Sequence, residues 1–157
     1  MKKTIYSFRD SINLKNNKIL KLYLLISFLL NLTYLFLKVY KDRLSKKLAL
    51  TENLEPSEFM KVFRINDISV NIESIFIVIT LICLFIFAIK KYDIKQFFAV
   101  NFTYLVLFST ISFIVSNIFE IHFTSLIEQF IVVFQITVIV FIFYIIKTIF
   151  KKVKLFL

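Results

Sequence analysis

Four long runs of apolar residues divide this chain, and short charged segments separate them. The longest run, 96–119, has twenty-four positions without a charged residue and is flanked by Lys95 and Glu120. The runs are continuous instead of alternating, and each exceeds the roughly ten residues that a membrane β-strand needs. Because lipid offers the backbone no hydrogen-bond partners, such runs are predicted to be helices.

The predicted fold class is therefore all-α, an integral membrane protein with four transmembrane helices in a small antiparallel bundle. The spans are expected at about 19–40, 72–89, 96–119 and 129–146, within a membrane domain at 19–150. Basic tails, 1–18 and 151–157, lie on either side. Lys147, Lys151 and Lys154 recur at helical spacing, which predicts that the last helix continues along the membrane surface past Phe150.

The one sizeable loop, 39–72, contains the single proline of the chain. Pro56 followed by Glu58 predicts the start of a short helix, because proline suits a first turn and acids favour the positive helix end. Its apolar side chains share one face: Phe59, Met60 and Phe63. Either this helix lies in the membrane interface, or the segment is a solvated loop with incidental aromatic residues.

Composition supports the membrane assignment. The chain is 59% hydrophobic, has 21 Phe residues, and lacks Gly and Trp. Its residues favour AT-rich codons, so we expect the plasma membrane of an AT-rich bacterium or an organelle inner membrane. The single Cys83 lies within the second span, where a buried apolar role is expected.

The net charge of +10 sits in blocks beside the apolar runs. Anionic lipid headgroups are therefore the expected partners, and nucleic acid is not. With the termini inside, the internal segments carry thirteen Lys and Arg residues against seven outside. The positive-inside rule thus predicts that both termini are cytoplasmic.

Several kinds of chemistry are excluded by what the chain lacks. Phosphate-binding loops need glycine, and a chain with one Cys and one His cannot form a His/Cys metal cluster. We predict neither an enzyme nor a cofactor. An outer-face polar cluster is predicted at the ends of three helices, where it would bind a divalent cation or a basic segment: Glu73, Glu120, His122 and Glu128. Alternatively, these residues simply meet water at the helix ends.

No ionisable residue lies near the centre of any span, which argues against an ion-coupled transporter but not against a passive pore. The third span instead carries two polar stripes. One occupies an arc of about 80°, and comprises Asn101, Ser109, Ser112 and Ser116. The other lies nearly opposite, and comprises Thr103, Thr110 and Asn117.

These stripes have two interpretations. They are ordinary contacts within the bundle, or one faces the bundle and the other an outside partner. Ser112 and Ser116 form a small-xxx-small pair that permits close helix approach. Asn31 and Gln135 lie at middle depth on their own helices and are expected to hydrogen-bond to the first stripe.

The predicted function is that of a non-catalytic multi-pass membrane protein that contacts another membrane protein, or copies of itself, through its helices. It would be a small complex subunit or an inhibitor. The layout resembles that of immunity proteins against pore-forming bacteriocins, which are small, basic and polytopic with a long first loop. This resemblance involves no motif and assigns no functional residue. The alternative is a passive channel or small transporter in which several copies line a path.

Overall fold

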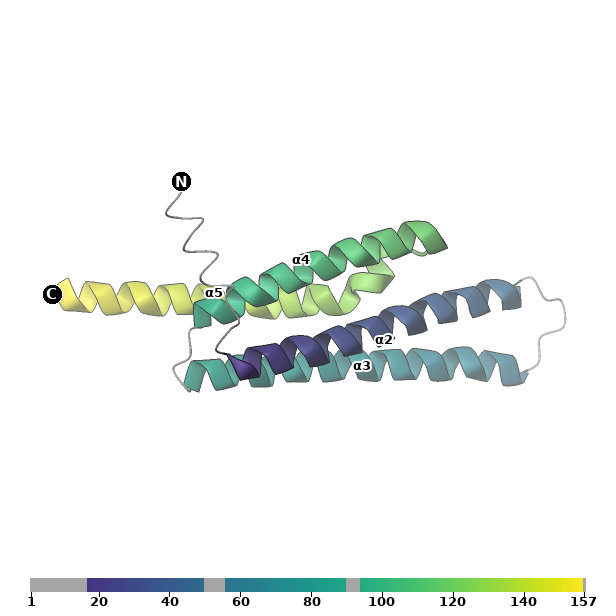
Figure 1. Cartoon of the computed structure of the whole chain (residues 1–157), viewed down its shortest axis with the longest axis horizontal. Coiled ribbons are helices and arrows are strands. Elements are labelled where there is room, and N and C mark those ends of the chain that lie inside the picture. The colour runs from purple at the N-terminus through teal and green to yellow at the C-terminus, as the bar shows by residue number, and fades with distance from the viewer. Residues whose placement is uncertain (1–16, 50–55, 90–93, 157) are drawn as a thin grey trace.

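The computed structural model describes residues 17–49, 56–89 and 94–156, and all regular secondary structure in them is helical. There are four helices in this part of the chain: α2 (Lys18–Ala49), α3 (Pro56–Ile89), α4 (Ile94–Phe119) and α5 (Phe123–Phe156) (Figure 1). Each contains a stretch long and apolar enough to cross a membrane. The predicted all-α class with four candidate membrane spans is thus confirmed.

The predicted first loop is much shorter than expected. α2 continues to Ala49, and α3 runs without interruption from Pro56 to Ile89. The helix start at Pro56 was predicted correctly, but the prediction of a separate short helix was wrong, because α3 is continuous. The hydropathy of the sequence shows only where each apolar stretch ends. The two helices continue beyond that point because their polar ends pack together, and the Lys41 ammonium donates to Asn66 Oδ1.

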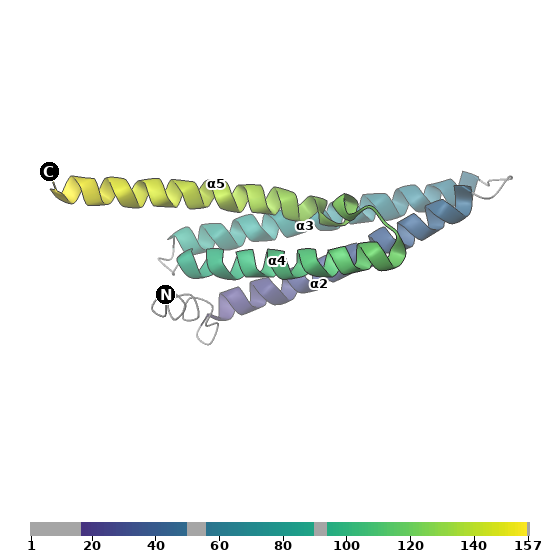
Figure 2. The same ribbon diagram turned by 90° about the horizontal axis from the view of Figure 1, so that it is seen from above.

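Two pairs of helices make up the molecule. α2 and α3 lie side by side, α4 and α5 form the second pair, and two helices of one pair contact each other more extensively than any two helices of different pairs do (Figures 1 and 2). The α2–α3 pair extends beyond the α4–α5 turn at one end. At the other end α5 continues past its neighbours, which confirms that the last helix extends beyond position 150.

The turn between α4 and α5 reverses the chain without a glycine. Glu120 takes the left-handed backbone conformation with φ of 54°, which glycine usually provides after a helix. The Ile121 N–H donates to the Ser116 carbonyl at 3.1 Å, and the Ser116 hydroxyl donates to the Ile121 carbonyl at 2.6 Å. The first bond satisfies the Ser116 carbonyl near the end of α4, and the second connects the Ser116 side chain to the backbone after the turn, so the two helices form a tight hairpin.

The apolar core consists of two clusters at different depths. The first contains Cys83, buried as predicted, among buried residues of α2, α3 and α4: Leu20, Tyr23, Leu84, Phe87, Phe97, Phe98 and Val100. The second lies towards the α4–α5 turn and comprises Leu35, Phe76, Leu105, Phe108, Ile121, Leu126, Phe130 and Val133. Polar side chains occupy the interior between and beyond these clusters.

Candidate functional site

A row of polar residues on α2 faces α4 and α5. Its members recur every three or four positions, which places them on one face of the helix: Tyr23, Ser27, Asn31, Tyr34 and Lys38. The first four are buried, and the Lys38 side chain is only 12% exposed. We call this row, with the polar groups of α4 and α5 that it contacts, the polar seam.

At the Tyr23 end of the seam, one hydrogen-bond network joins all four helices. The Tyr23 hydroxyl donates to Asn101 Oδ1 at 2.7 Å and lies 3.3 Å from Thr80 Oγ1. The Asn101 amide nitrogen in turn donates to Thr137 Oγ1 at 3.0 Å. Since each helix supplies one member, the network sets the depth of every helix relative to the others.

At the next levels the seam joins α2 to α4 and then to α5. The Asn31 amide donates to the Tyr104 hydroxyl at 2.6 Å, and the Tyr34 hydroxyl donates to the Ser125 carbonyl at 3.2 Å. The sequence reading missed the tyrosines because it counted them with the apolar residues. Their three-to-four spacing with Asn31 along α2 was the signal that would have revealed the seam.

The Lys38 end of the seam is charged, and we call it the charged level. Lys38 Nζ lies 3.1 Å from Glu128 Oε2 and 5.1 Å from the centre of the Tyr34 ring. Glu73 of α3 interacts electrostatically with both Glu128 and Lys38. The Lys38 ammonium is thus stabilised by a carboxylate of α5 and an aromatic face of its own helix together.

Four buried polar atoms along this interior have no hydrogen-bond partner in the described part of the protein. They belong to three residues with no exposed surface: Asn31 Oδ1, Ser112 Oγ, and both amide atoms of Gln129. Gln129 lies next to Glu128 of the charged level. Ser112 lies one helical turn after Phe108, whose ring contacts Phe130 of α5. The sequence reading missed Gln129 because it stood at the predicted edge of a span.

The two polar stripes of α4 face opposite ways. In the first, Asn101 and Ser112 are buried, and Ser109 and Ser116 are half-buried. The second stripe satisfies itself, since each of its side chains donates to the carbonyl four residues earlier on α4: Thr103, Thr110 and Asn117. The side chains of the second stripe therefore have hydrogen-bond acceptors within α4 and do not need a polar partner outside it.

Two expected contacts of the first stripe are absent. Asn31 is fully buried but bonds to Tyr104, which lies outside the stripe. Gln135 is exposed on the outer face of α5, so its expected bond across the bundle was wrong. The buried amide of this helix is Gln129, whose different angle around α5 directs it inwards.

The predicted outer-face cluster is only partly brought together. Glu73 and Glu128 share the charged level of the seam, whereas Glu120 and His122 are exposed at the α4–α5 turn. The Glu120 carbonyl accepts a hydrogen bond from Lys46 Nζ at 2.9 Å. Within the described residues, no group of three or more His, Cys, Asp or Glu side chains is placed to hold a metal ion.

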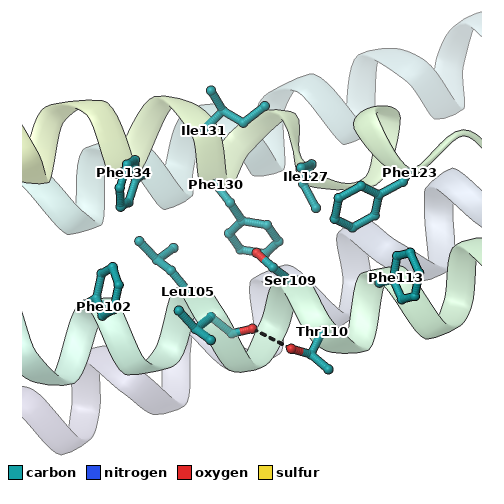
Figure 3. Close-up of a pocket in the computed structure, with 11 residues that line it drawn as sticks. Phe102, Leu105, Ser109, Thr110, Phe113, Phe123, Ile127, Phe130, Ile131 and Phe134 are labelled. Atoms are coloured by element: carbon teal, nitrogen blue, oxygen red, sulfur yellow. Dashed lines mark hydrogen bonds between the residues drawn. The ribbon is translucent and has the colours of Figure 1, made fainter.

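A groove of about 500 Å³ lies between α4 and α5 on the outer face of this pair. Figure 3 shows phenylalanine rings from both helices along it, with Ser109 and Thr110 on the α4 wall. The rings that line it are Phe102, Phe113, Phe123, Phe130 and Phe134. The groove is thus an apolar hollow with two hydroxyl groups, and Thr110 is exposed within it.

Comparison of the chain with protein-family models, with curated proteins and with solved structures finds no match.

Proposed function

We propose that this chain is a non-catalytic, multi-pass membrane protein that acts by packing its helices against another membrane protein. In this proposal the four helices form an antiparallel transmembrane bundle with both termini in the cytoplasm. Many large apolar side chains point outwards, among them Phe36 at 71% and Phe143 at 67% exposure. Such surfaces suit lipid, whereas water would drive them to associate.

The observation that carries the proposal is the groove between α4 and α5. Helices in lipid gain no hydrophobic free energy by associating, so they associate where their surfaces are complementary in shape. A hollow walled by aromatic rings offers a ridge of another helix more contact area than a convex helix face does. The exposed Thr110 hydroxyl, already bonded to the Val106 carbonyl at 3.0 Å, adds polarity without demanding a polar partner.

Two kinds of partner fit this proposal. The chain would be a small subunit of a larger membrane complex, or an inhibitor of the bacteriocin-immunity type that covers the helices of an invading protein. Both use the same groove. The identity of the crosslinked partner distinguishes them.

Photocrosslinking from α4 in native membranes tests the proposal. A photoreactive amino acid at Thr110 stands in the groove, whereas the same group at Ser112 stands in the interior of the bundle. A third probe at Val78, exposed on α3, reports random collisions. We expect an adduct with another protein, or with a second copy, from Thr110 alone. Adducts confined to the chain itself at all three positions would refute the proposal.

A further inference from the structure

The outward face of α4 carries a regular repeat. Its members recur at alternating intervals of four and three residues, and none of them is buried: Ala99, Thr103, Val106, Thr110, Phe113 and Asn117. They fall within an arc of about 80° around the helix axis. We call this set the α4 repeat. At 1.5 Å per residue it extends over about 27 Å, which is close to the ~30 Å depth of a hydrocarbon core.

The spacing of the α4 repeat is that of a left-handed helix pair. Alternating intervals of four and three average about 3.5 residues, which keeps one row of side chains against a second helix along its whole length. The exposed residues further round α4 differ from the repeat because they are purely aliphatic: Leu107, Ile111 and Ile114. The repeat therefore has the pattern of a helix contact, and the aliphatic side next to it has the pattern of a lipid contact.

The groove between α4 and α5 lies directly beside the repeat. Val106, Thr110 and Phe113 belong to both, and Figure 3 shows Thr110 and Phe113 on the α4 wall of the groove. A helix placed along the repeat would therefore also cover the groove, and its side chains would fill the hollow.

The polar end of the repeat is complementary to itself. The Asn117 amide nitrogen donates one N–H to the Phe113 carbonyl at 2.9 Å, which leaves its second N–H and Oδ1 without a partner among the described residues. An amide has both a donor and an acceptor, so two copies of Asn117 can each donate to the other. From Ala99 to Asn117 the chain has no charged residue, and two identical faces can therefore meet without bringing like charges together.

We propose that the partner in the groove is a second copy of this chain, and that the two copies pack α4 against α4 in parallel around a two-fold axis normal to the membrane. Copies inserted in the same orientation place identical residues at equal depth, so each member of the repeat meets its own counterpart. The inference rests on the proposed function, which places a helix of a membrane protein in the groove, and it names that protein.

Disulfide formation between copies tests the contact in purified protein in liposomes. In a Cys83→Ala background, Thr110→Cys places a thiol on the repeat, and Ile111→Cys places one on the aliphatic side, about 100° further round α4. We expect oxidation to give at least about fivefold more linked dimer from position 110 than from position 111, because a disulfide needs its two Cβ atoms close together. Equal yields, or no dimer from position 110, would overturn the proposal. Val106→Cys with Leu107→Cys is the second pair if a variant of the first does not fold.

The reciprocal amide pair is tested by adding Asn117→Leu to Thr110→Cys. Within one chain this substitution removes only a bond to the Phe113 carbonyl of the same helix, so the fold of the single copy is retained. We expect the yield of linked dimer to fall at least about threefold, because the amide contact between the copies is lost. An unchanged yield would contradict the parallel arrangement.

Photocrosslinking from Thr110 in native membranes separates this inference from the proposed function. An adduct of twice the mass of the chain supports the second copy. Adducts with a different protein alone would overturn the second copy and leave the proposed function in place. Adducts confined to a single chain would overturn both.

Discussion

At the scale of single residues, two asparagines on α4 have opposite roles. Asn101 is buried and bonds to Tyr23 and Thr137, whereas Asn117 is exposed and donates to the Phe113 carbonyl of its own helix at 2.9 Å. In lipid, an amide directed outwards can satisfy itself on its own backbone, and one directed inwards can join helices. The same residue type therefore contributes differently according to its angle around α4.

The two asparagines allow a matched stability test. Asn101→Leu is expected to lower the free energy of unfolding by about 1–2 kcal/mol, because it leaves Tyr23 and Thr137 with fewer partners. Asn117→Leu removes only a bond to its own helix and should change stability by less than about 0.5 kcal/mol. Unfolding in mixed micelles with increasing SDS measures both. Equal losses in the two variants would contradict the four-helix network.

At the scale of elements, the continuity of α2 and α3 changes the account of the first loop. Charged residues such as Lys41 and Arg43 lie within α2, and Arg43 stacks 4.7 Å from the Phe119 ring of α4. Phe59, Met60 and Phe63 lie within α3 and are exposed. Their shared face was predicted correctly, but it belongs to a 34-residue helix of about 51 Å.

Site-specific crosslinking tests this continuity. Cysteines at Lys41 and Asn66, whose side chains are in contact, should be joined by a short bifunctional thiol reagent. Asp67, the next residue of α3, is exposed and provides the control partner for Lys41. We expect efficient crosslinking for 41 with 66 and little for 41 with 67. The reverse result, or none in either pair, would indicate that α3 begins later in the chain.

At the scale of the whole molecule, the polar groups divide between an inner seam and an outer groove. The seam joins the two helix pairs, and the groove belongs to the α4–α5 pair alone. A partner bound in the groove would therefore leave the contacts along α2 in place.

The orientation of the molecule in the membrane is a further prediction at this scale. A reporter enzyme active only outside the membrane should be inactive when fused to either terminus and active when inserted between α2 and α3. The physical reason is the excess of Lys and Arg in the terminal segments and in 90–95. Activity from a terminal fusion would reverse the assignment and place the charged level of the seam on the cytoplasmic side.

The sequence by itself determined the helical class of the chain and its four candidate membrane spans. Charge-free runs of this length force the backbone to satisfy its own hydrogen bonds, so helices follow from composition and length alone. The helix start at Pro56 and the continuation of α5 were also readable, because proline geometry and lysine spacing are local features.

Only the tertiary structure decided which polar residues meet. Asn31 and Gln135 looked equivalent by depth, but one is buried against Tyr104 and the other faces outwards. Tyr23, Tyr34 and Gln129 became part of the site because helices far apart in the chain bring partners to them, or enclose them without one. Periodicity gives the angle of a residue around its own helix, whereas its partner depends on how the neighbouring helices are placed and rotated.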